Sequence, residues 1–111
     1  ERESTLQKAT LQAAQVPLET ARMALQVMQI CVRAAAIGNV NAITDAASGA
    51  AFAKAAITAC SLNVYTNIAA LKDKTVKEGL KKELQEIHEQ ILVLDEEIVR
   101  VLKTRADIAY P

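Results

Sequence analysis

The sequence predicts an all-α protein, an antiparallel bundle of helices at about 5–16, 17–37, 42–71 and 76–105. Three observations support this. Apolar residues from Leu80 to Val101 recur in alternating steps of four and three, a helical period. Hydrophobic residues make up 51% of the chain but aromatic residues only 3%, so Ala, Leu, Val and Ile must form a core of closely packed helices. No segment shows the alternating pattern of a strand.

The first two predicted helices are separated at a proline. Ser4 and Gln7 have the spacing of a capping box, which predicts a helix start near Thr5. Pro17 has no N–H to donate and disfavours helical geometry in the preceding residue, so the helix should kink or restart there. Apolar residues then recur at helical spacing until Gly38, which predicts a helix end with a left-handed glycine.

The third helix should follow a short loop in which either Asn39 or Asn41 caps the helix start. Small side chains dominate the segment from Ala42 to Leu71 and allow neighbouring backbones to approach closely. We therefore expect it to be the most buried helix.

The fourth helix should begin at a second capping box, formed by Thr75 and Glu78. Its apolar residues alternate as in a coiled-coil seam. These residues are Leu80, Leu84, Ile87, Ile91, Leu94, Ile98 and Val101.

Composition argues against several classes of partner. Thirteen basic and thirteen acidic residues give a formal net charge of +0, and no segment concentrates the basic ones, so nucleic acid is not an expected partner. Asp45 and Lys54 interrupt the Ala-rich stretch before it could span a bilayer. Without a recognisable signal peptide, the expected location is the cytoplasm. Cys31 and Cys60 lie in apolar helical runs, which favours reduced thiols and offers no metal-ligand spacing.

Three polar side chains inside the Ala-rich helix are the candidate functional residues: Asp45, Asn63 and Asn67. Five whole helical turns separate Asp45 from Asn63, so the two lie on one face, about 27 Å apart. They cannot contact one small molecule within a single chain. Lys54 falls on the opposite side and should be solvated. From spacing alone, Asp45 can equally be a first-turn carboxylate favoured by the helix dipole, and the Asn residues can be interhelical hydrogen-bonding groups.

Three strings carry a resemblance to a known family: Val16-Pro17-Leu18, Gly38 to Ala46 (GNVNAITDA) and Asn63 to Ile68 (NVYTNI). They resemble the strings V-P-L, G-N-x-N-x-x-S-D-A and N-V-x-x-N-L of the formimidoyltetrahydrofolate cyclodeaminase and methenyltetrahydrofolate cyclohydrolase family, in the same order and spacing. Thr44 stands in place of the Ser and Ile68 in place of the Leu. The resemblance covers about residues 3–106.

The resemblance implies a folate one-carbon interconversion, either cyclodeamination of 5-formiminotetrahydrofolate or hydrolysis of 5,10-methenyltetrahydrofolate. Both reactions pass through a tetrahedral carbon flanked by nitrogens. Asp45 is the candidate catalytic carboxylate, since it can stabilise the adjacent cation and shuttle a proton. Asn39, Asn41, Asn63 and Asn67 are the candidate substrate-binding residues. The substrate is a tetrahydrofolate derivative, and no cofactor or metal is expected.

Family domains are longer than this chain and begin with a Gly-rich turn and further helices. The expectation is therefore one helical domain over residues 1–111 that is a fragment lacking those N-terminal helices and is inactive alone. A homodimer or higher homo-oligomer is expected from the small residues and Asn on the third helix. The alternative function is a non-catalytic helical assembly or dimerisation module. The sequence does not distinguish deaminase from hydrolase, or say whether a formiminotransferase domain precedes it.

Overall fold

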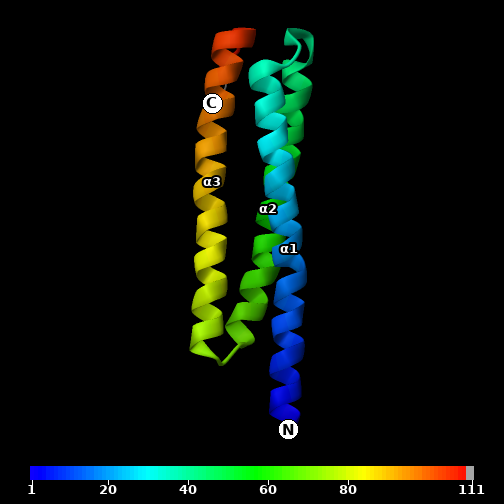
Figure 1. Ribbon diagram of the computed structural model, residues 1–111, viewed down its shortest axis with the longest axis vertical. Coiled ribbons are helices and arrows are strands. Elements are labelled where there is room, and N and C mark those ends of the chain that lie inside the picture. Colours follow the sequence, from blue (N-terminus) through cyan, green and yellow to red (C-terminus); the bar gives the residue numbers. More distant parts are fainter. Residues whose placement is uncertain (110–111) are drawn as a thin grey trace.

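Three long helices run up, down and up side by side in the computed structural model, which describes residues 1–109 (Figure 1). They are α1 (Arg2–Ile37), α2 (Ile43–Ala70) and α3 (Lys74–Ala106), with a short 3₁₀ helix η1 (Val40–Ala42) between α1 and α2. The bundle is elongated, 60 × 18 × 17 Å. No strand occurs in residues 1–109. The predicted all-α antiparallel bundle is confirmed.

The predicted restart of the helix at Pro17 is wrong, because α1 continues through the proline without interruption. Pro17 cannot donate to the carbonyl of Ala13, four residues earlier, which is the usual cost of proline inside a helix. The Nδ2 of Asn67 on α2 donates to that Ala13 oxygen at 3.3 Å. A side chain 54 residues away thus supplies the missing hydrogen bond, and predicted helices 5–16 and 17–37 form one helix.

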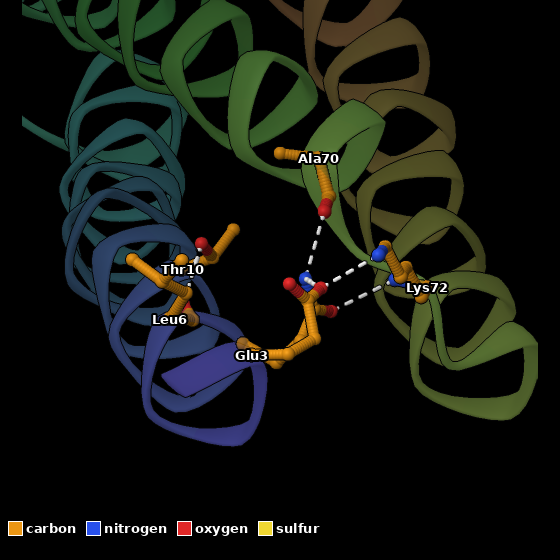
Figure 2. A network of polar contacts seen from close by, with 6 residues as sticks. Glu3, Leu6, Thr10, Ala70 and Lys72 are labelled. Carbon is orange, nitrogen blue, oxygen red and sulfur yellow. Dashed lines mark hydrogen bonds and ion pairs between the residues drawn. The ribbon is translucent and has the colours of Figure 1, made fainter. Parts of the chain in front are cut away.

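The predicted capping box at Ser4 is also wrong. The N-cap of α1 is Glu1 and makes no side-chain hydrogen bond. Gln7 instead contacts the α2–α3 junction: its Nε2 donates to the carbonyl of Ala70 at 3.2 Å, and its Oε1 accepts from the N–H of Lys72 at 2.9 Å. Figure 2 shows this network, in which Lys72 Nζ also pairs with Glu3 at 2.7 Å. These contacts fix the start of α1 against the end of α2.

Gly38 ends α1 without the predicted left-handed conformation, since its φ is −83° and its ψ is −166°. Glycine is needed for space, because a Cβ would lie 2.5 Å from the carbonyl oxygen of Ala34. The guanidinium of Arg105, on α3, donates to the carbonyls of Ala35 at 2.5 Å and Gly38 at 2.8 Å. Arg105 therefore satisfies helix-end carbonyls for which a left-handed glycine would provide backbone donors.

The start of α3 differs from the second predicted capping box. Asp73 is the N-cap and accepts from the N–H of Val76 at 3.2 Å, so neither Thr75 nor Glu78 has that role. The positive end of the helix dipole also favours a carboxylate at this position. The predicted coiled-coil seam is confirmed: six of its seven residues are buried and Leu94 is partly buried.

Small residues on α2 bring it close to α1. A Cβ on Gly49 would lie 2.9 Å from the Sγ of Cys31, so a larger side chain would not fit at the present helix separation. Yet α2 has seven buried residues, as do α1 and α3, and Phe52 is 78% exposed. Because α2 has 28 residues, against 36 in α1 and 33 in α3, its buried fraction is the highest of the three, as expected, although one of its faces has no neighbour.

Polar pairs join α1 to α3 along their exposed edge. Arg22 forms an ion pair with Glu83, and Gln29 Nε2 donates to Gln90 at 3.1 Å. The hydrogen bond with Glu83 and its negative charge raise the pKa of the Arg22 guanidinium. Within residues 1–109 no helix is both long enough and apolar enough to cross a membrane.

Replacing Gly79 with Ala should stabilise the protein by about 0.5–1 kcal/mol, because glycine inside a helix has excess freedom in the unfolded chain. Gly79 is exposed on α3, and a Cβ there would meet nothing within 4 Å. Chemical denaturation of the Gly79→Ala variant measures the effect, with Gly49→Ala as the sterically restricted counterpart. A loss of stability at Gly79 would mean that α3 does not have this exposed face.

Candidate functional site

Asp45 lies in the first turn of α2 with its side chain exposed. It does not cap the helix, since the N-cap is Ala42 and no side-chain cap hydrogen bond is formed there. Within residues 1–109 its carboxylate forms no ion pair. The carboxylate is therefore available for an external positive charge.

The two loop Asn residues lie at the same end of the bundle as Asp45. Asn39 caps η1 by accepting from the backbone N–H of Asn41 at 2.8 Å. The prediction that Asn39 or Asn41 caps the long helix after the loop is wrong, because the N-cap of α2 is Ala42. Both Asn side chains are exposed. Arg105, bonded to the carbonyl of Gly38, holds the start of this loop. Sequence reasoning missed Arg105 because it follows the loop by more than sixty residues and no local pattern links the two.

Asn63 and Asn67 lie in the other half of α2, towards the α2–α3 connection. Asn63 is exposed, whereas Asn67 is half-buried and uses its Nδ2 to donate to Ala13 and to the carbonyl of Asn63, the latter at 2.9 Å. Asn67 thus makes the interhelical hydrogen bond that was the alternative to a substrate-binding role. α2 is continuous between Asp45 and Asn63, so about 27 Å separates them. One chain does not bring the five predicted residues together.

The face that carries Asp45 and Asn63 points away from α3. Lys54 lies half a turn round α2 from Asp45, and its Nζ pairs with Asp95 of α3 at 2.5 Å. Lys54 is exposed to solvent, as expected, and also forms this surface ion pair. Because Lys54 marks the side of α2 next to α3, Asp45 and Asn63 lie on the opposite, uncovered side.

The best-formed cavity of the described part of the chain lies elsewhere, between α2 and α3, with a volume of about 410 Å³. It contains none of the five predicted site residues, of which four are exposed and Asn67 is half-buried. Its wall is largely apolar, with the Lys54–Asp95 pair on it. The lining residues are Met28, Thr44, Ala47, Ser48, Ala50, Ala51, Lys54, Asp95, Ile98, Val99, Leu102 and Ile108.

Other reactive side chains do not converge on Asp45. Cys31 and Cys60 are free, half-buried thiols, as predicted. His88 is half-buried, with its Nδ1 2.7 Å from the carbonyl oxygen of Leu84. In the part of the chain that the structure describes, no group of three or more His, Cys, Asp or Glu residues is arranged to hold a metal ion.

Two comparisons relate the chain to known proteins. A family model described as Formiminotransferase-cyclodeaminase matches residues 1–86. A methenyltetrahydrofolate cyclohydrolase from Methylorubrum extorquens is 31% identical over 106 residues, which is 96% of this chain and 51% of the relative. The chain thus spans about half the length of that curated relative. All five predicted site residues fall inside the family match, whereas Asp95 and Arg105 fall outside it.

Proposed function

Because the chain belongs to the formiminotransferase-cyclodeaminase family, whose place is in folate one-carbon metabolism, we propose that it takes part in hydrolysing 5,10-methenyltetrahydrofolate. The observation that carries this is the Asp45 carboxylate. It is exposed and outside any ion pair of the described residues, and it lies within the string GNVNAITDA. The name of the relative favours hydrolysis over cyclodeamination, which is the other reaction of the family.

The reaction has a single demanding step, the addition of water to a cationic carbon. The methenyl carbon lies between two nitrogens that share its positive charge. As the water oxygen bonds to that carbon, the water must lose a proton. One carbon–nitrogen bond of the tetrahedral intermediate then breaks, and the hydroxyl group loses its remaining proton, which leaves a formyl group on the other nitrogen. The leaving nitrogen takes up a proton.

Asp45 is suited to both demands of this step. Its negative charge favours binding of the cation next to it, and an ionised carboxylate can accept the proton from the attacking water. The same group, once protonated, can return that proton to the leaving nitrogen. Exposed Asn39 and Asn41, at the same end of the bundle, are the nearest uncharged groups for hydrogen bonds to the pterin.

The second candidate function, a helical assembly module, is favoured by a different observation. The face of α2 opposite α3 is uncovered and carries Phe52, which is 78% exposed. An exposed apolar face of this kind is typical of an interaction surface. The two functions are compatible if assembly completes the site.

The proposed activity is tested with the chain alone and with the chain co-expressed with the remaining half of the Methylorubrum relative. Each preparation is incubated with 5,10-methenyltetrahydrofolate and its loss of absorbance is followed; ammonia release from 5-formiminotetrahydrofolate is measured in parallel. We expect methenyl hydrolysis faster than in buffer. The proposal would be contradicted if neither preparation binds or converts either substrate. Ammonia release without methenyl hydrolysis would assign the cyclodeamination reaction instead.

A further inference from the structure

The end of α3 contacts the loop between α1 and α2 through one side chain. The two segments lie at the same end of the bundle (Figure 1). The guanidinium of Arg105 donates from Nη1 to the carbonyl of Ala35 at 2.5 Å and from Nη2 to the carbonyl of Gly38 at 2.8 Å. Ala35 is in the last turn of α1 and Gly38 is its C-cap, so the two nitrogens span the point at which the chain leaves the helix.

The charge of Arg105 has main-chain partners only. The last turn of α1 contains no basic residue of its own, and the carbonyls at the C-terminal end of a helix carry partial negative charge. Arg105 is half-buried and forms no ion pair with a carboxylate within residues 1–109. Charge-assisted hydrogen bonds of this kind are about twice as strong as neutral ones. Arg105 therefore supplies the end of α1 with a positive charge that α1 itself lacks.

The segment that carries Arg105 is itself fixed. Val101 and Leu102, about one turn earlier on α3, are buried, with exposures of 2% and 4%. After Arg105 the helix ends at Asp107, which has a left-handed φ of 55°, and the N–H of Ile108 donates to the carbonyl of Leu102 at 3.0 Å. Ile108 packs against the core. Arg105 thus lies between two anchored parts of the chain, and its guanidinium has a defined position.

The loop between α1 and α2 is anchored at both ends and exposed between them. Arg105 holds Gly38 at the first end, and Ile43, which is 1% exposed, anchors the start of α2 at the other. Asn39 and Asn41 lie between these anchors. The Oδ1 of Asn39 accepts from the N–H of Asn41, so its Nδ2 is the group that remains to bind a ligand. The position of both amides therefore depends on Arg105.

We propose that Arg105 is a positioning residue for substrate binding: by holding the loop at Gly38, it sets where the amides of Asn39 and Asn41 meet the pterin. The kinetic part of this inference rests on the proposed function; the anchoring of the loop does not. The inference extends the functional unit to the end of α3, beyond residues 1–86 that the family model matches. Nothing in the local sequence around Arg105 indicates this role, because its partners are on α1.

The two kinetic constants should respond differently to the loss of Arg105. Asp45 is on α2, whose start is anchored by buried Ile43 rather than by Arg105. In a preparation that hydrolyses 5,10-methenyltetrahydrofolate, Arg105→Ala should raise KM about tenfold, the effect of losing roughly one hydrogen bond to the pterin. It should change kcat by less than about threefold, since binding that is equal in the ground state and the transition state affects KM alone.

Two further variants separate positioning from a general loss of stability. Arg105→Lys should give a KM between those of wild type and Arg105→Ala, because lysine keeps the charge but lacks the planar fork that reaches two carbonyls. Lys103→Ala removes an exposed positive charge from the same last turn of α3 and should leave KM unchanged. A less stable protein would have fewer active molecules and a lower apparent kcat at the same KM. That result for Arg105→Ala, or an equal rise of KM in Lys103→Ala, would overturn the proposal.

Hydrogen exchange tests the anchoring of the loop without a measurement of activity. The N–H groups of Asn41 and Ala42 donate to Asn39 within the loop. In Arg105→Ala their exchange should be at least about tenfold faster, because the loop opens locally. The N–H of Lys72, hydrogen-bonded at the opposite end of the bundle, should exchange as in wild type.

Exchange in the loop that does not rise, or that rises equally at Lys72, would overturn the proposal whatever the activity of the protein. A wild-type chain that binds and converts no folate, but whose loop exchange depends on Arg105 as expected, would contradict the proposed function and not the anchoring of the loop. The two failures are therefore distinguishable.

Discussion

Replacing Asp45 with Asn is expected to lower kcat/KM for methenyl hydrolysis by about 10²–10⁴-fold, the usual contribution of a positioned proton-transfer group. The stability of the protein should change little. Asn has nearly the same shape, and the Asp45 side chain is exposed and makes no cap hydrogen bond that would be lost. Loss of its favourable position near the helix dipole would cost only about 0.3–1 kcal/mol.

The measurement pairs a kinetic assay with a thermal melt of the same preparation. Glu96→Gln is the matched control, because Glu96 is an exposed carboxylate on α3, whereas Asp45 lies on the side of α2 that faces away from α3. This substitution should change neither quantity appreciably. Near-normal turnover of the Asp45→Asn variant together with a lowered melting temperature would return Asp45 to a purely structural role.

The second large effect is expected at Pro17, whose replacement with Ala should stabilise the protein by about 1–3 kcal/mol. Proline inside a helix is roughly 3 kcal/mol less favourable than alanine, and the hydrogen bond from Asn67 to Ala13 offsets part of that cost. Removing that bond with Asn67→Ala should destabilise the wild-type chain by about 1 kcal/mol. In the Pro17→Ala background the loss should be smaller, because the alanine introduced there has a backbone N–H that can donate to the same carbonyl.

A double-mutant cycle by chemical denaturation measures this coupling, which we expect to be about 1 kcal/mol. Additive effects would show that Asn67 does not compensate for the proline. The cycle also separates the two roles considered for Asn67. If its task is only to complete α1, activity lost in Asn67→Ala should return in the double variant; if Asn67 contacts the substrate, activity should stay low.

Local periodicity predicted those features that depend on neighbours in the sequence. The coiled-coil seam of α3 and the shared face of Asp45 and Asn63 follow from helical geometry alone. The failed predictions at Pro17 and Gly38 depended on side chains far along the chain, Asn67 and Arg105. A propensity argument contains no information about such partners.

The apolar residues in the second half of α1 form one set by helical spacing, whereas the structure divides them into two stripes. Ala21, Met28 and Ala35 are buried, and Met23 and Val27 are exposed. Periodicity alone does not separate a broad buried face from two adjacent faces with different neighbours. The positions of the five candidate site residues along α2 and the loop before it were predictable from the sequence. The ion pair between Lys54 and Asp95 was not, because it depends on how α3 packs against α2.

The most direct test of the account is methenyl hydrolysis by a mixture of two impaired variants, Asp45→Asn and Asn63→Ala. If each site takes Asp45 from one chain and Asn63 from the other, a mixed dimer contains one intact site. Random pairing of equal amounts should then restore up to about one quarter of wild-type activity, although each variant alone is nearly inactive. A mixture no more active than the average of the two variants would contradict a shared site.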